Sequence, residues 1–130
     1  MKYMYTAVIT PSEDGAKFYA RVPDIPGCIT TGNSLDDAIV QITDALNGCL
    51  VVAEDMGLDI AAPTPQNALP HGPSDVLTLV SADTIAYRAK TDTRAIRKNV
   101  SIPAWMAKLA DQRGINCSKV LQDALRQALA

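Results

Sequence analysis

The spacing of apolar residues changes at Ser34, and this change restricts the possible folds more than any other feature of the sequence. Before it, KYMYTAVITP places alternate side chains on opposite faces of an extended chain, which is typical of a strand. From Ser34 onward, apolar residues recur every three or four positions as far as Ala53, which predicts a helix with one buried stripe. We therefore predict an α+β fold in which a helix packs on a sheet.

Turn and cap residues divide the N-terminal part further. Gly15 in SEDG and the pair Pro26-Gly27 predict turns that separate KYMYTAVITP, KFYARVP and a third short strand from Cys28 to Thr31. Ser34 is suited to cap the helix and Gly57 to end it. After a loop with four prolines, DVLTLVSAD predicts a fourth strand. Residues 1–83 therefore form a predicted β-β-β-α-β domain.

The two ends of the chain differ in the sign of their charge. Residues 1–83 carry three basic and eleven acidic side chains, a balance of −8, whereas residues 84–130 carry nine basic and three acidic ones, a balance of +6. Such a split favours two partners of opposite charge. Two solvated surfaces that differ without functional meaning are the alternative.

The segment RKNVSIPAWM opens the basic end with a strand-like alternation and continues as a helix after Pro103. We expect this helix over residues 104–113, a stop at Gly114, and a second helix capped by Asn116 or Ser118. One strand and two short helices bury too little apolar surface to fold alone, and a lone strand leaves its backbone unpaired. A homodimer that pairs two strands over four helices satisfies both requirements.

This dimerising unit is predicted to span residues 94–130, with Trp105 and Met106 in its core and residues 84–93 as a linker that holds at most a short helical turn. Further pairing of dimers into a tetramer through the N-terminal domains is left open. A two-stranded ribbon of this kind fits the major groove of B-form DNA.

The segment RKNVSIPAWMAKLADQRGINCSKVLQDALRQAL resembles the ribbon-helix-helix DNA-binding fold, because its strand ends in Val-x-Ile-Pro and a Gly-x-Asn-x-Ser turn separates its helices. The segment ARVPDIPGCITTGNSLDDAIVQITDAL resembles the HicB-type antitoxins through Val-Pro-Asp-x-Pro-Gly-Cys and a helix-opening Ser-x-x-Asp-Ala. The resemblance implies a partial ribonuclease-H-like N-terminal domain that binds and occludes a small basic mRNA-cleaving toxin, HicA. It also implies a C-terminal dimer that represses its own operon, as in a type II toxin–antitoxin system.

Strand parity selects the residues expected to contact operator DNA. Arg97, Asn99 and Ser101 share the outward face and are the predicted contacts to base edges. A solvated sheet face is the alternative for these three residues. Phosphate contacts are predicted for Lys98, Ser118 and Lys119, although Ser118 is better suited to act only as a helix cap.

The toxin contacts are predicted only as a set of acidic or aromatic positions around the hairpin and the long helix. Most charged residues on such surfaces are simply solvated, which is the alternative for each of them. The set comprises Glu13, Asp14, Tyr19, Asp24, Asp36, Asp37 and Asp44.

Catalysis, a metal site and a cofactor are not expected. Metal-dependent hydrolysis in such a fold needs carboxylates on the first strand, and KYMYTAVITP has none. Asp36 and Asp37 point about 100° apart on a helix, and Cys28 is predicted to be a buried structural thiol because no histidine lies near it in the sequence. Three widely spaced cysteines, no secretion signal and no long apolar run favour a cytoplasmic protein without membrane partners.

Two rival functions remain at this point. The first is a stand-alone ribbon-helix-helix transcription regulator whose N-terminal domain senses a ligand. The second is a catalytic N-terminal domain, which hydrolysis of RNA with Mg²⁺ or Mn²⁺ would reveal. A gene for a short basic toxin directly beside this one would favour the antitoxin.

Overall fold

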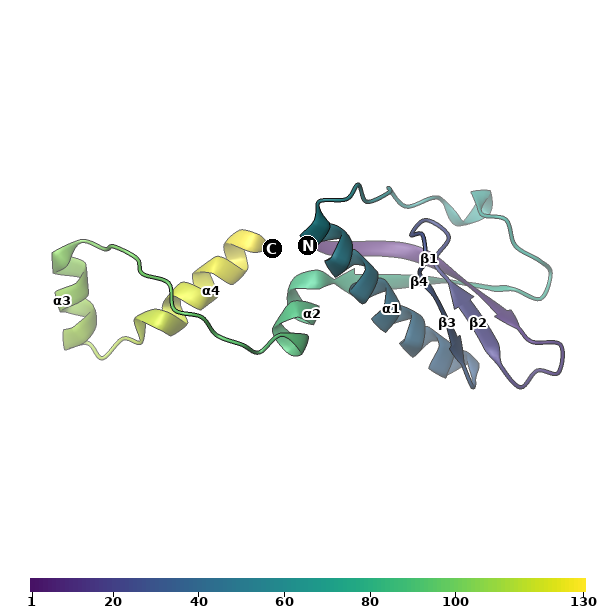
Figure 1. Cartoon of the computed structure of the whole chain (residues 1–130), viewed down its shortest axis with the longest axis horizontal. Helices are drawn as coiled ribbons and strands as arrows, with labels where there is room; N and C mark the ends of the chain where they lie inside the picture. Colours follow the sequence, from purple (N-terminus) through teal and green to yellow (C-terminus); the bar gives the residue numbers. More distant parts are fainter.

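The alternating segments before Ser34 and after the proline loop form one antiparallel sheet of four strands in the computed structural model, which describes residues 1–130. The strand order is β3-β2-β1-β4, so the first strand lies inside the sheet (Figure 1). All four predicted strands are present, and the third begins one residue late because Cys28 still belongs to the preceding turn. The strands are β1 (Lys2–Pro11), β2 (Phe18–Arg21), β3 (Ile29–Gly32) and β4 (Val76–Asp83).

One face of the sheet carries α1 (Leu35–Met56), the helix that the apolar stripe predicts. It begins at the predicted cap, because Ser34 Oγ accepts a hydrogen bond of 3.0 Å from the backbone N–H of Asp37. It ends at the predicted glycine, because Gly57 has a φ of 66°, the left-handed conformation common at helix ends. Both predicted ends of the helix are confirmed.

The core lies between α1 and the sheet. The helix meets the edge strand β3 at Gly32, where an added Cβ would lie 2.5 Å from Ala38 Cα. Only glycine allows the two backbones to come this close. The core residues from α1 are Ala38, Ile42, Leu46 and Leu50, and those from the strands include Tyr5, Ala7, Ile9, Ala20, Val80 and Ala82.

After β4 the chain continues directly into α2 (Thr84–Thr91), which packs against α1. Asp83 caps this helix by accepting a hydrogen bond of 3.2 Å from the backbone N–H of Ala86. The segment expected to be a linker therefore opens with eight helical residues that belong to the N-terminal packing. A short 3₁₀ helix, η1 (Gln66–Ala68), lies in the proline loop.

Residues 92–103 run as an extended chain with no strand partner, and α3 (Ala104–Gln112) and α4 (Cys117–Leu129) follow at a distance from the sheet (Figure 1). The strand expected in RKNVSIPAWM is absent from the single chain, because a strand needs a neighbour to complete its backbone hydrogen bonds. Both C-terminal helices are present, with Gly114 between them as predicted. None of the helices is both long and apolar enough to cross a membrane.

Candidate functional site

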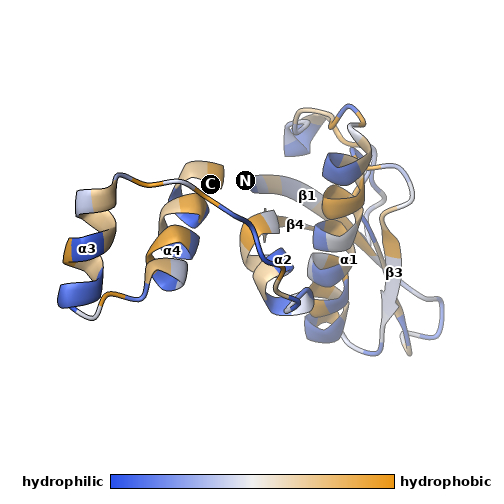
Figure 2. Ribbon diagram, turned by 60° about the vertical axis from the view of Figure 1, so that its left-hand side comes forward, coloured by the Kyte–Doolittle hydropathy of each residue, from blue (hydrophilic) through white to orange (hydrophobic).

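The C-terminal part of the chain leaves its apolar side chains in the open. No residue from 92 to 130 is buried, and the side chains of Trp105 and Val100 are 63% and 57% exposed. Figure 2 shows hydrophobic residues along both α3 and α4, well separated from the core of the sheet domain. Contiguous apolar surface of this kind is typical of an interaction site.

An apolar groove of about 470 Å³ runs between α3, α4 and the extended segment before them. From the extended segment, Lys98, Val100 and Ile102 line this groove. Arg97 and Asn99 do not. The alternation predicted for a ribbon strand is therefore present in the extended chain, with Lys98 on the apolar side.

The predicted base-contact residues, Arg97, Asn99 and Ser101, are exposed and make no side-chain hydrogen bond or ion pair within the chain. At the start of α4 the structure shows which of the two candidate residues, Asn116 or Ser118, caps the helix. Asn116 Oδ1 accepts a hydrogen bond of 3.2 Å from the backbone N–H of Lys119, so Asn116 is the cap. The alternative role of Ser118 as the cap is wrong, because Ser118 lies inside the first turn and lines the apolar groove.

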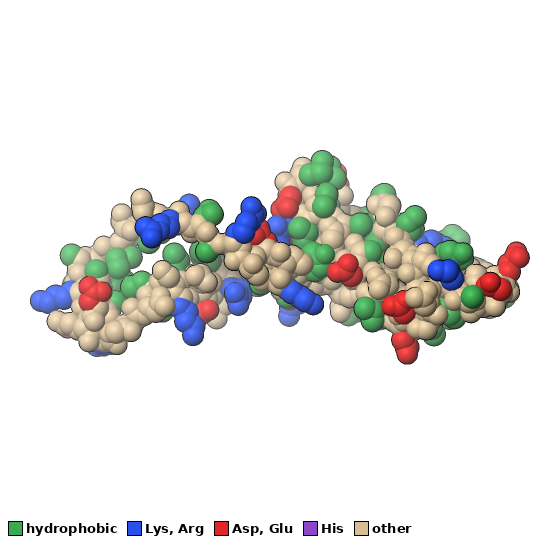
Figure 3. Space-filling model, turned by 60° about the horizontal axis from the view of Figure 1, so that its bottom comes forward, with side chains coloured by type: hydrophobic (Ala, Val, Ile, Leu, Met, Phe, Trp, Pro, Cys, Tyr) green, Lys and Arg blue, Asp and Glu red, His purple; other side chains and the backbone are tan.

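The charge split of the sequence is also a split in space. Figure 3 shows Lys and Arg side chains gathered over the extended segment and the C-terminal helices, and Asp and Glu side chains over the sheet domain. Arg94 differs from the other basic residues of this segment, because its guanidinium pairs with Asp92 at 2.9 Å. This contact lowers the pKa of Asp92 to about 2.

The residues predicted to contact the toxin come from separate elements. Several of the carboxylates already serve local structure. Asp14 accepts hydrogen bonds from Ser12 Oγ at 2.6 Å and from the backbone N–H of Ala16, which lower its pKa. Asp37 accepts one from the backbone N–H of Asn33 at 2.8 Å. The set is distributed over the β1–β2 turn (Glu13, Asp14), the outer face of β2 (Tyr19), the loop after β2 (Asp24) and the first half of α1 (Asp36, Asp37, Asp44).

The structure also contains a polar cluster at the C-terminal end of α1 that was not predicted from the sequence. The carboxylate of Glu54 accepts hydrogen bonds from Tyr3 Oη at 2.7 Å, from Thr84 Oγ1 at 3.1 Å and from Arg88 at 3.2 Å. Burial raises the pKa of Glu54, but these three donors outweigh it and lower the pKa. Arg88 also pairs with Asp55 at 2.9 Å. The cluster fixes α2 to α1.

Two features test the idea of a catalytic centre. Cys28 is buried as predicted, and burial followed by the neighbouring Cys49 thiol raises its pKa to about 12, so it stays protonated at neutral pH. The chain contains no group of three or more His, Cys, Asp or Glu side chains placed to bind a metal ion.

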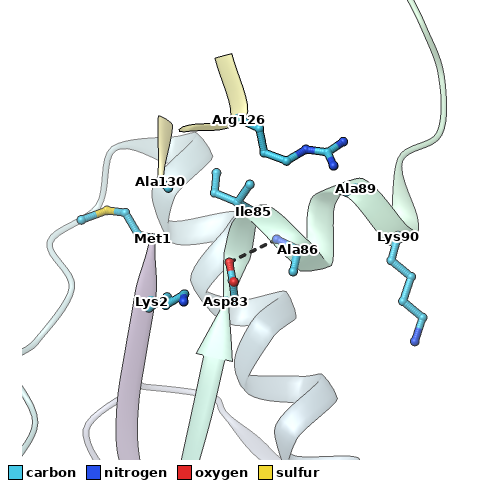
Figure 4. A pocket seen from close by; sticks show the side chains of 9 residues that line it. All are labelled: Met1, Lys2, Asp83, Ile85, Ala86, Ala89, Lys90, Arg126 and Ala130. Atoms are coloured by element: carbon cyan, nitrogen blue, oxygen red, sulfur yellow. Dashed lines mark hydrogen bonds between the residues drawn. The ribbon is translucent and has the colours of Figure 1, made fainter. Parts of the chain in front are cut away.

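The cavity drawn in Figure 4, of about 730 Å³, lies where the end of α4 comes near the N-terminus and α2. Its wall at α2 is formed by the apolar residues Ile85, Ala86 and Ala89 and by Lys90. Asp83, the one carboxylate side chain in the wall, is already the cap of α2. Arg126 enters from α4. This cavity presents no converging set of acid and base groups, and its walls come from both parts of the chain.

Comparison with known proteins shows which family and which solved folds the chain resembles. Residues 5–124 match the family described as HicB-like antitoxin of bacterial toxin–antitoxin systems. A 42-residue stretch is 40% identical to UPF0150 protein Ta0767 of Thermoplasma acidophilum; it makes up 32% of this chain and spans 59% of that relative.

Among solved structures, the fold is similar to the crystal structure of the antitoxin HicB of Burkholderia pseudomallei, with a TM-score of 0.54, 28% identity and coverage of 98% of this chain and 99% of that one. It is also similar to a chain of a toxin–antitoxin complex from Streptococcus pneumoniae, with a TM-score of 0.62, 22% identity and the same coverage of both chains. The mixed α+β fold with a four-stranded antiparallel sheet is thus one that HicB structures share.

Proposed function

Because the chain belongs to the HicB-like antitoxin family of bacterial toxin–antitoxin systems, we propose that it binds and occludes a HicA-like mRNA-cleaving toxin and represses its own operon. The observation that carries the proposal is the division of the chain into two parts of opposite charge. The acidic part has a closed core, whereas the basic part has none. Each part therefore suits a different partner.

The sheet domain has the properties of an inhibitor. We propose that it is a partial ribonuclease-H-like domain that blocks the toxin by steric and electrostatic occlusion. Its net charge of −8 over residues 1–83 suits a basic RNA-cleaving partner. β1 carries no carboxylate, which supports a binding role over metal-dependent hydrolysis. A solved structure that shares this fold is a toxin–antitoxin complex, which also supports the proposal.

The basic part has the properties of one half of a dimeric DNA-binding domain. We propose that residues 96–102 pair with the same residues of a second chain to form a ribbon over four helices. Pairing would complete the backbone hydrogen bonds of the extended segment and cover the apolar groove against α3 and α4. Arg97, Asn99 and Ser101 would then face the major groove, and Lys119 would be available to phosphates. Lys98 and Ser118 line the apolar groove, so the phosphate contacts proposed for them require their polar ends to leave the groove at its edge.

Co-expression of the full chain with the product of the neighbouring gene tests the inhibitory role. We expect the two proteins to co-purify and the full chain to restore growth and intact mRNA to cells that express the toxin. The matched control is the toxin expressed with an empty vector. If the purified chain binds DNA upstream of its own gene but never the neighbouring product, the stand-alone regulator is the better assignment.

A further inference from the structure

A groove of about 520 Å³ lies beside the C-terminal half of α1, on the acidic domain. Three segments form its walls. They are the loop after β2, with Asp24 and Pro26; the helix itself, with Gly48 and Val52; and the chain after the helix, with Leu58 and Asp59. The volume is in the range that accommodates a large side chain or a small ligand.

The groove is held open by contacts that do not depend on a partner. Tyr5 Oη donates a hydrogen bond of 2.5 Å to the carbonyl oxygen of Ala61. Asp24 accepts hydrogen bonds from the backbone N–H and the hydroxyl of Thr64, at 2.9 and 2.5 Å. These bonds tie the chain after α1 to β1 and to the loop after β2. A groove with fixed walls loses little conformational entropy when a partner enters it.

The chemistry of the walls selects the kind of group that fits. Val52 and Leu58 are each 54% exposed, although both are large and apolar. Asp24 and Asp59 are the only charged residues that line the groove, and both are acidic. Exposed apolar side chains beside two carboxylates suit an apolar side chain that has a Lys or Arg next to it.

We propose that this groove is the toxin-binding site of the acidic domain, and that it receives a toxin segment in which an apolar side chain adjoins a Lys or Arg. The inference rests on the proposed function and makes it specific. Of the seven residues predicted for toxin contact, it selects Asp24. It adds Val52, Leu58 and Asp59, which lie in the second half of α1 and beyond it.

Two matched substitutions on α1 test the groove. Val52→Lys places a cation inside the groove, whereas Val40→Lys places the same charge on the same helix at a residue that is 64% exposed and does not line it. Affinity of the full chain for the purified product of the neighbouring gene is measured by calorimetry. We expect Val52→Lys to weaken binding at least tenfold and Val40→Lys to change it less than twofold.

The possible results of this binding experiment distinguish a wrong binding site from a wrong function. If the unmodified chain binds the toxin and Val52→Lys binds equally well, or if both variants lose affinity equally, the groove is not the site. If the unmodified chain does not bind the toxin, the proposed function itself fails.

A footprint on the unmodified chain gives an independent measurement. Cys49 lines the groove and is half-buried, Cys28 is buried, and Cys117 lines the separate C-terminal groove, away from the acidic domain. Alkylation by iodoacetamide is followed at each cysteine by peptide mass spectrometry, with and without the toxin. We expect the rate at Cys49 to fall at least fivefold in the complex and the rate at Cys117 to stay constant. An unchanged rate at Cys49 would overturn the assignment.

Discussion

At the scale of single residues, three donors that are distant in sequence meet at the carboxylate of Glu54. Tyr3 comes from the first strand, and Thr84 and Arg88 come from α2. Burial and the Glu54 carboxylate together raise the pKa of Tyr3 to about 12, so its hydroxyl remains a donor at any physiological pH. Glu54 therefore joins the sheet, α1 and α2 through one charged group.

Replacing Glu54 by Gln should destabilise the full chain by about 1–3 kcal/mol, the usual effect of weakening charged hydrogen bonds to a half-buried group. Asp55→Asn is the matched control. Asp55 also pairs with Arg88, but its side chain is 59% exposed, so its loss should cost less than about 1 kcal/mol. Urea unfolding followed by circular dichroism measures both variants, and equal losses would contradict the role of Glu54.

The dependence on pH follows from the lowered pKa of Glu54. A carboxylate with a lowered folded-state pKa stabilises the fold above its unfolded pKa of about 4.3, and loses this contribution as pH falls through the folded value. The difference in stability between the unmodified chain and Glu54→Gln should therefore be largest near neutral pH and shrink below about pH 4.

Residue roles that depend only on neighbours in the sequence, such as helix capping, could be predicted from the sequence. Ser34 and Gly57 were predicted as the ends of α1 because capping depends on neighbours within a few positions. Glu54 could not be predicted, because its partner Arg88 is 34 residues away in a segment that looked like a linker. The acidic wall residue Asp59 was missed for the same reason, since its neighbour Asp24 in the groove belongs to a distant loop.

At the scale of elements, the contact between β3 and α1 depends on one position without a side chain. Gly32→Ala should destabilise the domain by about 1–3 kcal/mol, because the new Cβ would overlap the backbone of Ala38, which cannot move without moving the helix. Gly48→Ala is the contrasting variant. Its Cβ would meet only the Tyr87 hydroxyl at 3.7 Å, so the better helix former should stabilise α1 by up to about 1 kcal/mol.

Thermal unfolding of both glycine variants measures these two effects. A stabilised Gly32→Ala variant would show that β3 and α1 lie further apart than in this structure.

The sequence predicts the strands and α1 well because each has a strong apolar period. It does not predict the strand order or α2, because an eight-residue helix with polar residues shows little periodicity and its docking depends on contacts across the fold.

At the scale of the whole molecule, the uncovered apolar surface of residues 92–130 predicts a homodimer. Val100→Asp should give a monomer that no longer binds the DNA upstream of its own gene, because a carboxylate would face the apolar groove. The double variant Arg97→Ala with Asn99→Ala should remain a dimer and lose at least tenfold in affinity for the same DNA.

Light scattering and gel-shift assays measure the two properties separately, and light scattering also distinguishes a dimer from a tetramer. Unchanged DNA binding by the double variant would show that the ribbon is not the reader. A dimeric Val100→Asp would place the dimer contact elsewhere.

The docking of α2 on α1 also limits how far the two parts of the chain can separate. If the ribbon begins near Ile96, only residues 92–95 connect it to the packed domain that ends with α2 at Thr91. Four residues span at most about 14 Å. On DNA, each toxin-binding domain would thus be held on a short tether against the duplex, where its bulk, and that of any bound toxin, would obstruct proteins approaching the adjoining base pairs.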